Sequence, residues 1–287
     1  MLTRWLSAIV GIPLFLGLCL WGREPFGVAV FLIALLGLWE LSTAWRKAGI
    51  HANLLLLAMG LVLPLYAWTN WLDTGPAMDW TRASRLDALL FAAGAALLIA
   101  AIAEVARAAR TGELQVGRNL GYGLLGGCWL ALFSAIAWLR ADTADVRAGL
   151  FPHMDAGVAR LLVTVFCVWA TDSFALFAGW AFGRHKLAPY LSPAKTVEGA
   201  IGGFLASVLV GALFGRLFLG QPILGSLIGA IAGVLGQLGD LFKSSLKREV
   251  GIKDFGSIIP GHGGALDRFD SLLFVAPVAC LLFSVVR

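Results

Sequence analysis

The residues best suited to do chemistry lie together near the end of the chain, in the stretch KDFGSIIPGHGGALDRFDS from Lys253 to Ser271. Its nineteen positions hold two basic residues, three aspartates, one histidine and four glycines. Asp267 and Asp270 are three residues apart, so they share one face if a helix begins there. Glycines let backbone N–H groups approach phosphate oxygens, and carboxylates with water bind Mg²⁺. The stretch therefore predicts a site for phosphate and metal.

A second charged segment, GQLGDLFKSSLKR at residues 236–248, precedes it. At helical spacing, one face of this segment carries a carboxylate, a hydroxyl and two ammonium groups, from Asp240, Lys243, Ser244 and Lys247. One interpretation is a solvated, salt-bridged helix end. The position of Asp240, directly after an apolar run where an ionisable group is expensive, favours a functional interpretation.

A third segment, residues 170–199, adds a carboxylate and a candidate anion site. Asp172 lies within an apolar run, where it should face a partner or a polar cavity. Ser192 followed by Pro193 is typical of a helix start, which would place Lys195 and Thr196 in the first turn. Exposed N–H groups at such a start, with Lys195 beside them, favour an anion. An ordinary capped helix is the alternative.

The composition places these segments in a membrane protein. The chain has 287 residues, of which 59% are hydrophobic and 14% charged, and its mean hydropathy is +0.85. Soluble globular domains carry about a quarter charged residues. We therefore expect an all-α, polytopic membrane protein whose nine apolar runs are long enough to cross a bilayer. The runs are residues 5–22, 26–45, 53–71, 86–106, 119–139, 159–181, 199–219, 222–241 and 271–286.

The distribution of basic residues predicts the orientation of those nine crossings. The side that holds the N-terminus receives fourteen of the twenty-two Lys and Arg residues. The positive-inside rule therefore puts the N-terminus in the cytoplasm and the C-terminus outside. On this count the loops after the sixth and the eighth run lie on the same, cytoplasmic, side, so their charged residues can meet.

No linker or repeat of fixed period divides the chain, so we expect one membrane domain over residues 1–287, with scaffold helices in 1–158 and a catalytic half in 159–287. In the scaffold, Glu40 and Glu104 lie near the ends of apolar runs, where an interfacial charge costs little. In the later helices, glycines recur at every fourth position in residues 199–203, 211–215 and 225–233. This spacing predicts close helix packing.

The string SLKREVGIKDFGSIIPGHGGALDRFD resembles the signature of the phosphatidate cytidylyltransferases, also called CDP-diacylglycerol synthases. In that family a serine, Lys-Arg, Lys-Asp, Pro-x-His-Gly-Gly and Asp-Arg-x-Asp recur at this spacing. ATDSFA and LSPAKTVEG resemble a second conserved region of the family, so the likeness covers residues 170–272. Ala265 departs from the pattern, since the family usually has a larger aliphatic residue there, but the change touches no charged position.

The resemblance implies a multi-spanning, metal-dependent enzyme that joins CTP to phosphatidic acid, giving CDP-diacylglycerol and pyrophosphate. It implies a catalytic Mg²⁺, with a second cation left open, whose ligands come from Asp240, Asp267, Asp270 and Asp172. The catalytic residues carried over are Asp240, Lys243, Lys247, Arg248, Lys253 and Asp267. The residues that would bind substrate are Ser192, Lys195, Thr196, Glu198, Ser244, His262, Gly263, Gly264 and Arg268. We expect His262 to donate a hydrogen bond to a phosphate oxygen or to brace the glycine turn rather than act as a base, because phosphatidate at neutral pH has no proton that must be removed.

The expected partners are CTP, phosphatidic acid and the lipid bilayer, with no nucleic acid, and the resemblance implies a homodimer. The expected location is the inner cell membrane, with the active site at its cytoplasmic face. Two alternatives stay open: a CTP-dependent lipid kinase that moves the γ-phosphate, and a transporter, for which Asp172 and the glycine-rich helices would also serve. A CDP-alcohol phosphotransferase is disfavoured, because its Asp-x2-Asp-Gly-x2-Ala-Arg run is missing from the sequence.

The orientation can be tested with a reporter that is active only outside the cytoplasm. Fused after Arg287, it should be active, because nine crossings from a cytoplasmic N-terminus end outside. The same reporter fused at the N-terminus is the matched control and should be silent. A silent C-terminal fusion beside a folded, expressed protein would show that the number of crossings is even.

Overall fold

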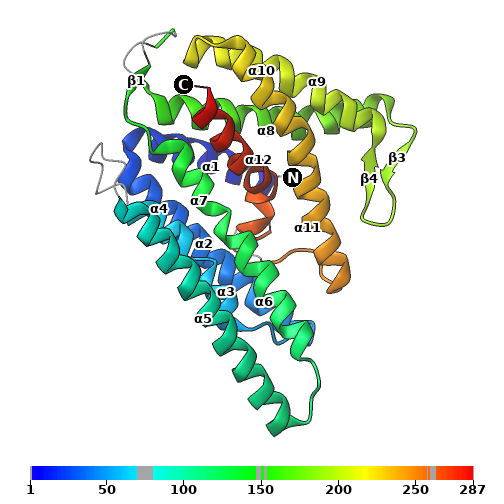
Figure 1. Cartoon of the computed structure of the whole chain (residues 1–287). Coiled ribbons are helices and arrows are strands. Elements are labelled where there is room, and N and C mark those ends of the chain that lie inside the picture. The colour runs from blue at the N-terminus through cyan, green and yellow to red at the C-terminus, as the bar shows by residue number, and fades with distance from the viewer. Residues whose placement is uncertain are drawn as a thin grey trace. The chain divides into compact units, whose positions relative to one another are not determined.

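The computed structural model describes residues 2–69, 80–146, 150–151, 154–256, 258 and 263–286. Figure 1 shows helices throughout, with two short pairs of strands. The expectation of an all-α fold therefore holds for the body of the chain. In chain order the elements are α1 (Leu2–Trp21), α2 (Arg23–Lys47), α3 (Leu54–Met59), α4 (Val62–Thr69), α5 (Trp80–Thr111), α6 (Val116–Ala131), α7 (Phe133–Arg140), β1 (Asp145–Val146), β2 (Met154–Asp155), α8 (Ala156–Phe182), β3 (Lys186–Ala188), β4 (Ser192–Thr196), α9 (Val197–Phe214), the π-helical turn η2 (Gly215–Leu219), α10 (Pro222–Ile231), the π-helical turn η3 (Ala232–Gly236), α11 (Gln237–Glu249) and α12 (Leu266–Val285).

Many of these helices are suited to a bilayer by length and composition. Within the described ranges, six are long and apolar enough to cross one: Arg23–Lys47, Val116–Arg140, Ala156–Phe182, Val197–Leu219, Pro222–Glu249 and Leu266–Val285. Two shorter apolar helical stretches, Val10–Trp21 and Leu54–Tyr66, accompany them. A polytopic membrane protein fits this pattern, while the count of nine crossings and their orientation stay predictions.

Two of the predicted runs take a different form in the structure. The run 53–71 is divided between α3 and α4, and its last two residues lie outside the described ranges. The division falls at Gly60, where a Cβ atom would collide with the carbonyl oxygen of Gly127. The run 86–106 lies inside the longer helix α5.

The strand pair β3–β4 corrects one prediction. Ser192 does not cap a helix, because residues 192–196 are extended and pair antiparallel with β3, with Lys186 opposite Thr196. The N-cap of α9 is instead Thr196, whose side chain accepts a hydrogen bond from the N–H of Gly199 at 3.1 Å. Lys195 and Thr196 therefore precede the helix. Pro193 is tolerated because both strands of a two-stranded pair are edge strands.

The contacts divide the chain into two compact units, residues 1–29 with 135–287 and residues 30–134. In the first unit α8 packs along α9, and α9 along α10 (Figure 1). The predicted close packing of glycines is confirmed there. A Cβ atom on Gly211 would collide with the backbone of Gly225, and a Cβ atom on Gly229 would collide with that of Ser207. Backbone-to-backbone contact of this kind makes a rigid frame.

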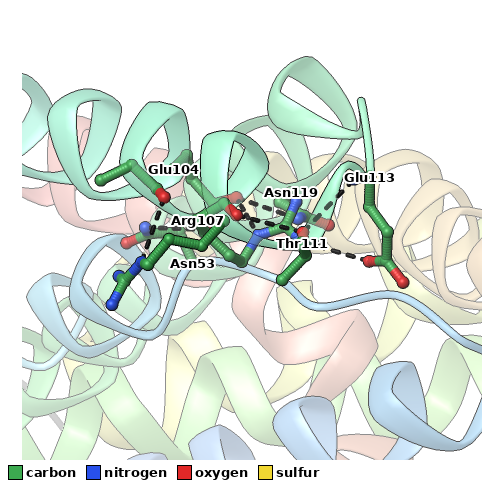
Figure 2. A network of polar contacts seen from close by, with 8 residues as sticks. Asn53, Glu104, Arg107, Thr111, Glu113 and Asn119 are labelled. Carbon is green, nitrogen blue, oxygen red and sulfur yellow. Dashed lines mark hydrogen bonds and ion pairs between the residues drawn. The ribbon is translucent and has the colours of Figure 1, made fainter.

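The second unit contains a buried polar network, drawn in Figure 2. The Glu104 carboxylate accepts hydrogen bonds from Asn119 Nδ2 at 3.0 Å, from Asn53 Nδ2 at 3.4 Å and from Arg107 Nε at 2.9 Å. These residues come from α5, from α6 and from the residue that caps α3. Glu104 is only 5% exposed, and Glu40 is fully buried. Glu104 is buried because polar partners from other elements surround its carboxylate, and the expected interfacial position of the two glutamates stays a prediction.

The network predicts a difference between two glutamates that both contact Arg107. Glu104→Ala removes the acceptor from two buried amides and a half-buried guanidinium and should lower the thermal unfolding midpoint in detergent by roughly 5 °C or more, since unsatisfied buried groups are costly. Glu113→Ala is the matched control. The Glu113 side chain is 54% exposed and holds Arg107 Nη1 at 3.2 Å, so its midpoint should stay within about 1 °C of the parent. Equal shifts in the two variants would contradict a structural role for Glu104.

Candidate functional site

A pocket of about 670 Å³ opens in the first unit where α8, β4, α9, α11 and α12 meet. This volume is ordinary for a small-molecule site. The wall contains eight of the predicted site residues: Asp172, Lys195, Thr196, Asp240, Lys243, Asp267, Arg268 and Asp270. Segments 170–199 and 236–271 therefore meet in one place, as the sequence predicted.

Lys243 is the central cation of this pocket. Its ammonium group lies 2.9 Å from Asp240 Oδ1 and also contacts Asp270 Oδ2. Lys243 is 7% exposed and Asp270 is 6% exposed, so each needs the other's charge. The spacing of Asp240 and Lys243 along α11 and of Asp267 and Asp270 along α12 turns both pairs inward, which confirms the predicted helical faces.

Lys195 links the strand β4 to helix α11. Its Nζ atom lies 2.5 Å from Asp240 Oδ2, so the carboxylate of Asp240 is held between two ammonium groups. The base of the same strand is fixed by close packing. The Thr196 hydroxyl would be 3.0 Å from a Cβ atom at either Gly179 or Gly199, so residues without side chains make room for it.

Asp267 serves the glycine-rich loop. Its Oδ2 atom accepts hydrogen bonds from the N–H groups of Phe255 and Gly264, both at 3.1 Å, and its Oδ1 atom lies 2.8 Å from Lys247 Nζ. The side chain is 1% exposed. Gly263 has a φ of +81°, a conformation that favours glycine. Asp267 thus joins both ends of the loop to α12. Lys247 does not line the pocket itself but contacts the Asp267 carboxylate, which does.

Glu198 holds the turn between α8 and β3. Its carboxylate accepts hydrogen bonds from the N–H groups of Arg184 and His185 and lies 2.6 Å from His185 Nδ1. Arg248 Nε lies 3.5 Å from the carbonyl oxygen of Leu191, at the tip of the β3–β4 pair. Glu198 and Arg248 therefore contact the turns that flank β3 and lie outside the pocket wall.

The other predicted residues that the structure describes also lie outside the pocket wall. Lys253 is exposed, and Ser192, Ser244 and Gly263 are half-buried. Gly264 is buried and gives its N–H to Asp267. His262 lies outside the described residues, so its predicted role as a hydrogen-bond donor stays a prediction.

Several wall residues were missed by the sequence reading. They include Leu176, Trp180, Lys186, Gln237 and Ser271. The spacing 172, 176, 179 and 183 could have indicated Leu176 and the nearby glycines, because these positions share a face of α8 with Asp172. Gln237 carries no comparable signal. Leu176 and Trp180 are 69% and 88% exposed, so this side of the pocket is apolar.

The fit of a divalent cation can be judged from the donors present. Asp172, Asp240 and Asp270 supply carboxylate oxygens to one pocket, which suits Mg²⁺. Asp172 has no hydrogen bond or ion pair with any described residue, so its oxygens are available. No set of three acidic, His or Cys residues in the described ranges is close enough to form a preformed cation site. The donor chemistry fits Mg²⁺, although ammonium groups now contact Asp240 and Asp270.

The charges on the wall balance. Four carboxylates, from Asp172, Asp240, Asp267 and Asp270, face four cations, from Lys186, Lys195, Lys243 and Arg268. Movable ammonium and guanidinium groups can transfer from carboxylates to phosphate oxygens. The fold and the site together define a class: a helical membrane protein with a charged pocket at the ends of its apolar helices.

Comparisons with known proteins narrow this class. The model of the cytidylyltransferase family matches residues 2–286. The phosphatidate cytidylyltransferase of Synechocystis sp. is 34% identical over 96% of this chain and 94% of its own length. That of Staphylococcus epidermidis is 32% identical over 98% of each chain. The corresponding protein of Thermotoga maritima is 42% identical over 47% of this chain and 53% of its own. The chain therefore belongs to the cytidylyltransferase family.

The contacts of Asp240 and Asp267 predict different failures. Asp240→Ala should reduce turnover to the assay background, because two lysines lose the carboxylate that positions them. Asp267→Ala should do the same and should also make residues 253–264 more sensitive to limited proteolysis, because both backbone anchors of the loop are lost. Asp142→Ala is the control. Asp142 pairs with Arg160 at 2.9 Å outside the pocket, so its loss should leave turnover unchanged. Near-normal activity in either pocket variant would refute these roles.

Proposed function

We propose that this chain transfers CMP from CTP to phosphatidic acid, releasing pyrophosphate and forming CDP-diacylglycerol. The full-length likeness to phosphatidate cytidylyltransferases supports this activity. The observation that carries the proposal in the structure is the meeting of Lys195 with Asp240 at 2.5 Å. It joins the two segments that resemble the family in one pocket large enough for a small substrate.

The reaction needs positioned charge more than proton transfer. A phosphate oxygen of phosphatidate attacks the α-phosphorus of CTP, and the bond from that phosphorus to the oxygen shared with the β-phosphate breaks. The electron pair leaves with pyrophosphate. The second pKa of a phosphate monoester is about 6, so the attacking phosphate is largely dianionic at neutral pH. The protein therefore acts by orienting two anions and stabilising the charge that moves between them.

The cations of the pocket divide this work by position. Lys195, Lys243 and Arg268 line the wall, where they can contact phosphate oxygens directly. Lys247 donates a hydrogen bond to Asp267 Oδ1 and so orients this carboxylate. Arg248 and Lys253 stay candidates for the triphosphate and pyrophosphate. Ser192, Thr196 and Glu198 shape the strand pair that carries Lys195.

A bound Mg²⁺ would neutralise charge on the triphosphate. Asp172, Asp240 and Asp270 are the proposed ligands that face the pocket, and Asp267 is a further candidate whose oxygens already accept from Phe255, Gly264 and Lys247. Carboxylate oxygens are the ligands that Mg²⁺ prefers. A second cation remains part of the proposal.

The proposed setting is the inner membrane, with the pocket at the cytoplasmic face, where CTP is found. Charged Asp240 and Lys243 lie toward the end of the apolar stretch Pro222–Glu249, and the exposed Leu176 and Trp180 offer an apolar side to a lipid. A water-soluble nucleotide and a lipid headgroup can meet only at such an interface. The proposed assembly is a homodimer, as the family resemblance implies.

Labelled CTP tests the activity. Purified protein with Mg²⁺, phosphatidic acid and CTP labelled separately at the α- and γ-phosphates should place α-label in lipid and γ-label in pyrophosphate. The Asp240→Ala variant is the control, and it should neither transfer α-label to lipid nor release γ-label as pyrophosphate. Lipid that acquires γ-label would establish a CTP-dependent lipid kinase and overturn the proposal. Replacing Mg²⁺ by excess chelator should abolish transfer, because the triphosphate charge is then uncompensated.

A further inference from the structure

Gln237 is a pocket residue to which the reaction scheme gives no role. It is the first residue of α11 and directly follows the π-helical turn η3. Its Nε2 atom donates to the carbonyl oxygen of Gly233 at 2.6 Å and to that of Ala200 in α9 at 3.0 Å. An amide nitrogen has two hydrogens, so both are used on carbonyl oxygens. This pattern fixes which end of the carboxamide is nitrogen.

The π turn explains why a side chain is needed here. The backbone N–H of Gln237 bonds to Val234 and does not close the usual bond to Gly233 four residues back. The Gln237 side chain supplies a donor to Gly233 instead. One side chain therefore stabilises an irregular turn and ties it to the neighbouring helix.

The same turn sets the direction in which α11 presents its charges. An inserted residue rotates everything that follows by about 100°, the angle of one helical residue. Asp240 and Lys243 lie three and six positions after Gln237. Without the π turn, both would point away from Asp270 and Lys195, which they now contact.

We propose that Gln237 is a positioning residue for nucleotidyl transfer. Its carboxamide clamps the π turn to α9 and so holds Asp240 and Lys243 in the rotation that completes the pocket. This inference rests on the proposed function, since it concerns the geometry of that same site. The alternative is that the remaining Oε1 atom accepts a hydrogen bond from the substrate, since Gln237 lines the pocket.

Three variants separate the two roles. Gln237→Met keeps the length of the side chain and removes both donor and acceptor. Gln237→Glu keeps an acceptor and turns the donor into an oxygen that faces two carbonyl oxygens. Gln221→Met is the matched control, because Gln221 is exposed, lies before α10 and makes no side-chain capping bond.

The positioning role predicts a loss in kcat with KM preserved. Both Gln237 variants should lower kcat by about 10- to 100-fold, because small misplacements of catalytic groups have effects of this size. The KM values for CTP and phosphatidic acid should stay within about twofold of the parent, since the phosphate-binding cations are retained. Gln221→Met should match the parent. Near-normal kcat in Gln237→Glu, or a raised KM with normal kcat, would overturn the proposal in favour of substrate contact.

A double-mutant cycle provides a readout that general destabilisation does not share. Gln237 and Lys195 both act on Asp240, so combining Gln237→Met with Lys195→Ala should reduce kcat by less than the product of the single effects. Multiplicative effects would overturn the proposal. The parent protein keeps the two proposals apart: failure of the parent to form CDP-diacylglycerol rejects the function, whereas an active parent with unaffected Gln237 variants rejects only the clamp.

Discussion

One ammonium group, that of Lys243, lies between the carboxylates of Asp240 and Asp270, and the arrangement of the pocket depends on it. A buried charge is costly unless an opposite charge and good hydrogen bonds surround it. Asp270 belongs to α12 and Lys243 to α11, so separating the two helices would leave the buried Asp270 without its cation and Lys243 with Asp240 alone. The ion pairs therefore act as a structural constraint before any substrate binds.

The frame around these charges is rigid because its helices approach without side chains between them. Gly211 and Gly225 bring the backbones of α9 and α10 into direct contact, and Gly199 does the same for α9 against Ala175 of α8. Apolar side chains on the outer faces could be exchanged without changing this approach. Larger residues at these glycines would move α9. The carbonyl oxygen of Ala200, near the start of α9, accepts a hydrogen bond from Gln237, so this contact would move as well.

Much of this site could be read from sequence because its rules are local. The i, i+3 spacing of Asp240 with Lys243 and of Asp267 with Asp270 fixes which charges share a face, whatever the helices pack against. Recurrent glycines likewise indicate close packing without naming the partner helix.

The features that escaped prediction are those decided by distant contacts. Ser192 and Thr196 are both good N-cap residues. Thr196 caps α9 because residues 192–196 pair with β3 and because Gly179 and Gly199 leave space for the Thr196 hydroxyl. The burial of Glu104 depends on Asn53 and Asn119, which are 51 and 15 residues away. The π turn before Gln237 leaves no mark in a pattern of apolar residues.

The balance of four carboxylates and four cations on the pocket wall also has an electrical meaning. A net charge moved through the whole membrane field gains or loses about 2.3 kcal/mol per 100 mV. A wall whose formal charges cancel feels no net force from that field, however deep in the bilayer it lies. The membrane voltage therefore exerts no net pull on the resting pocket and acts only on the separation between its carboxylates and its cations.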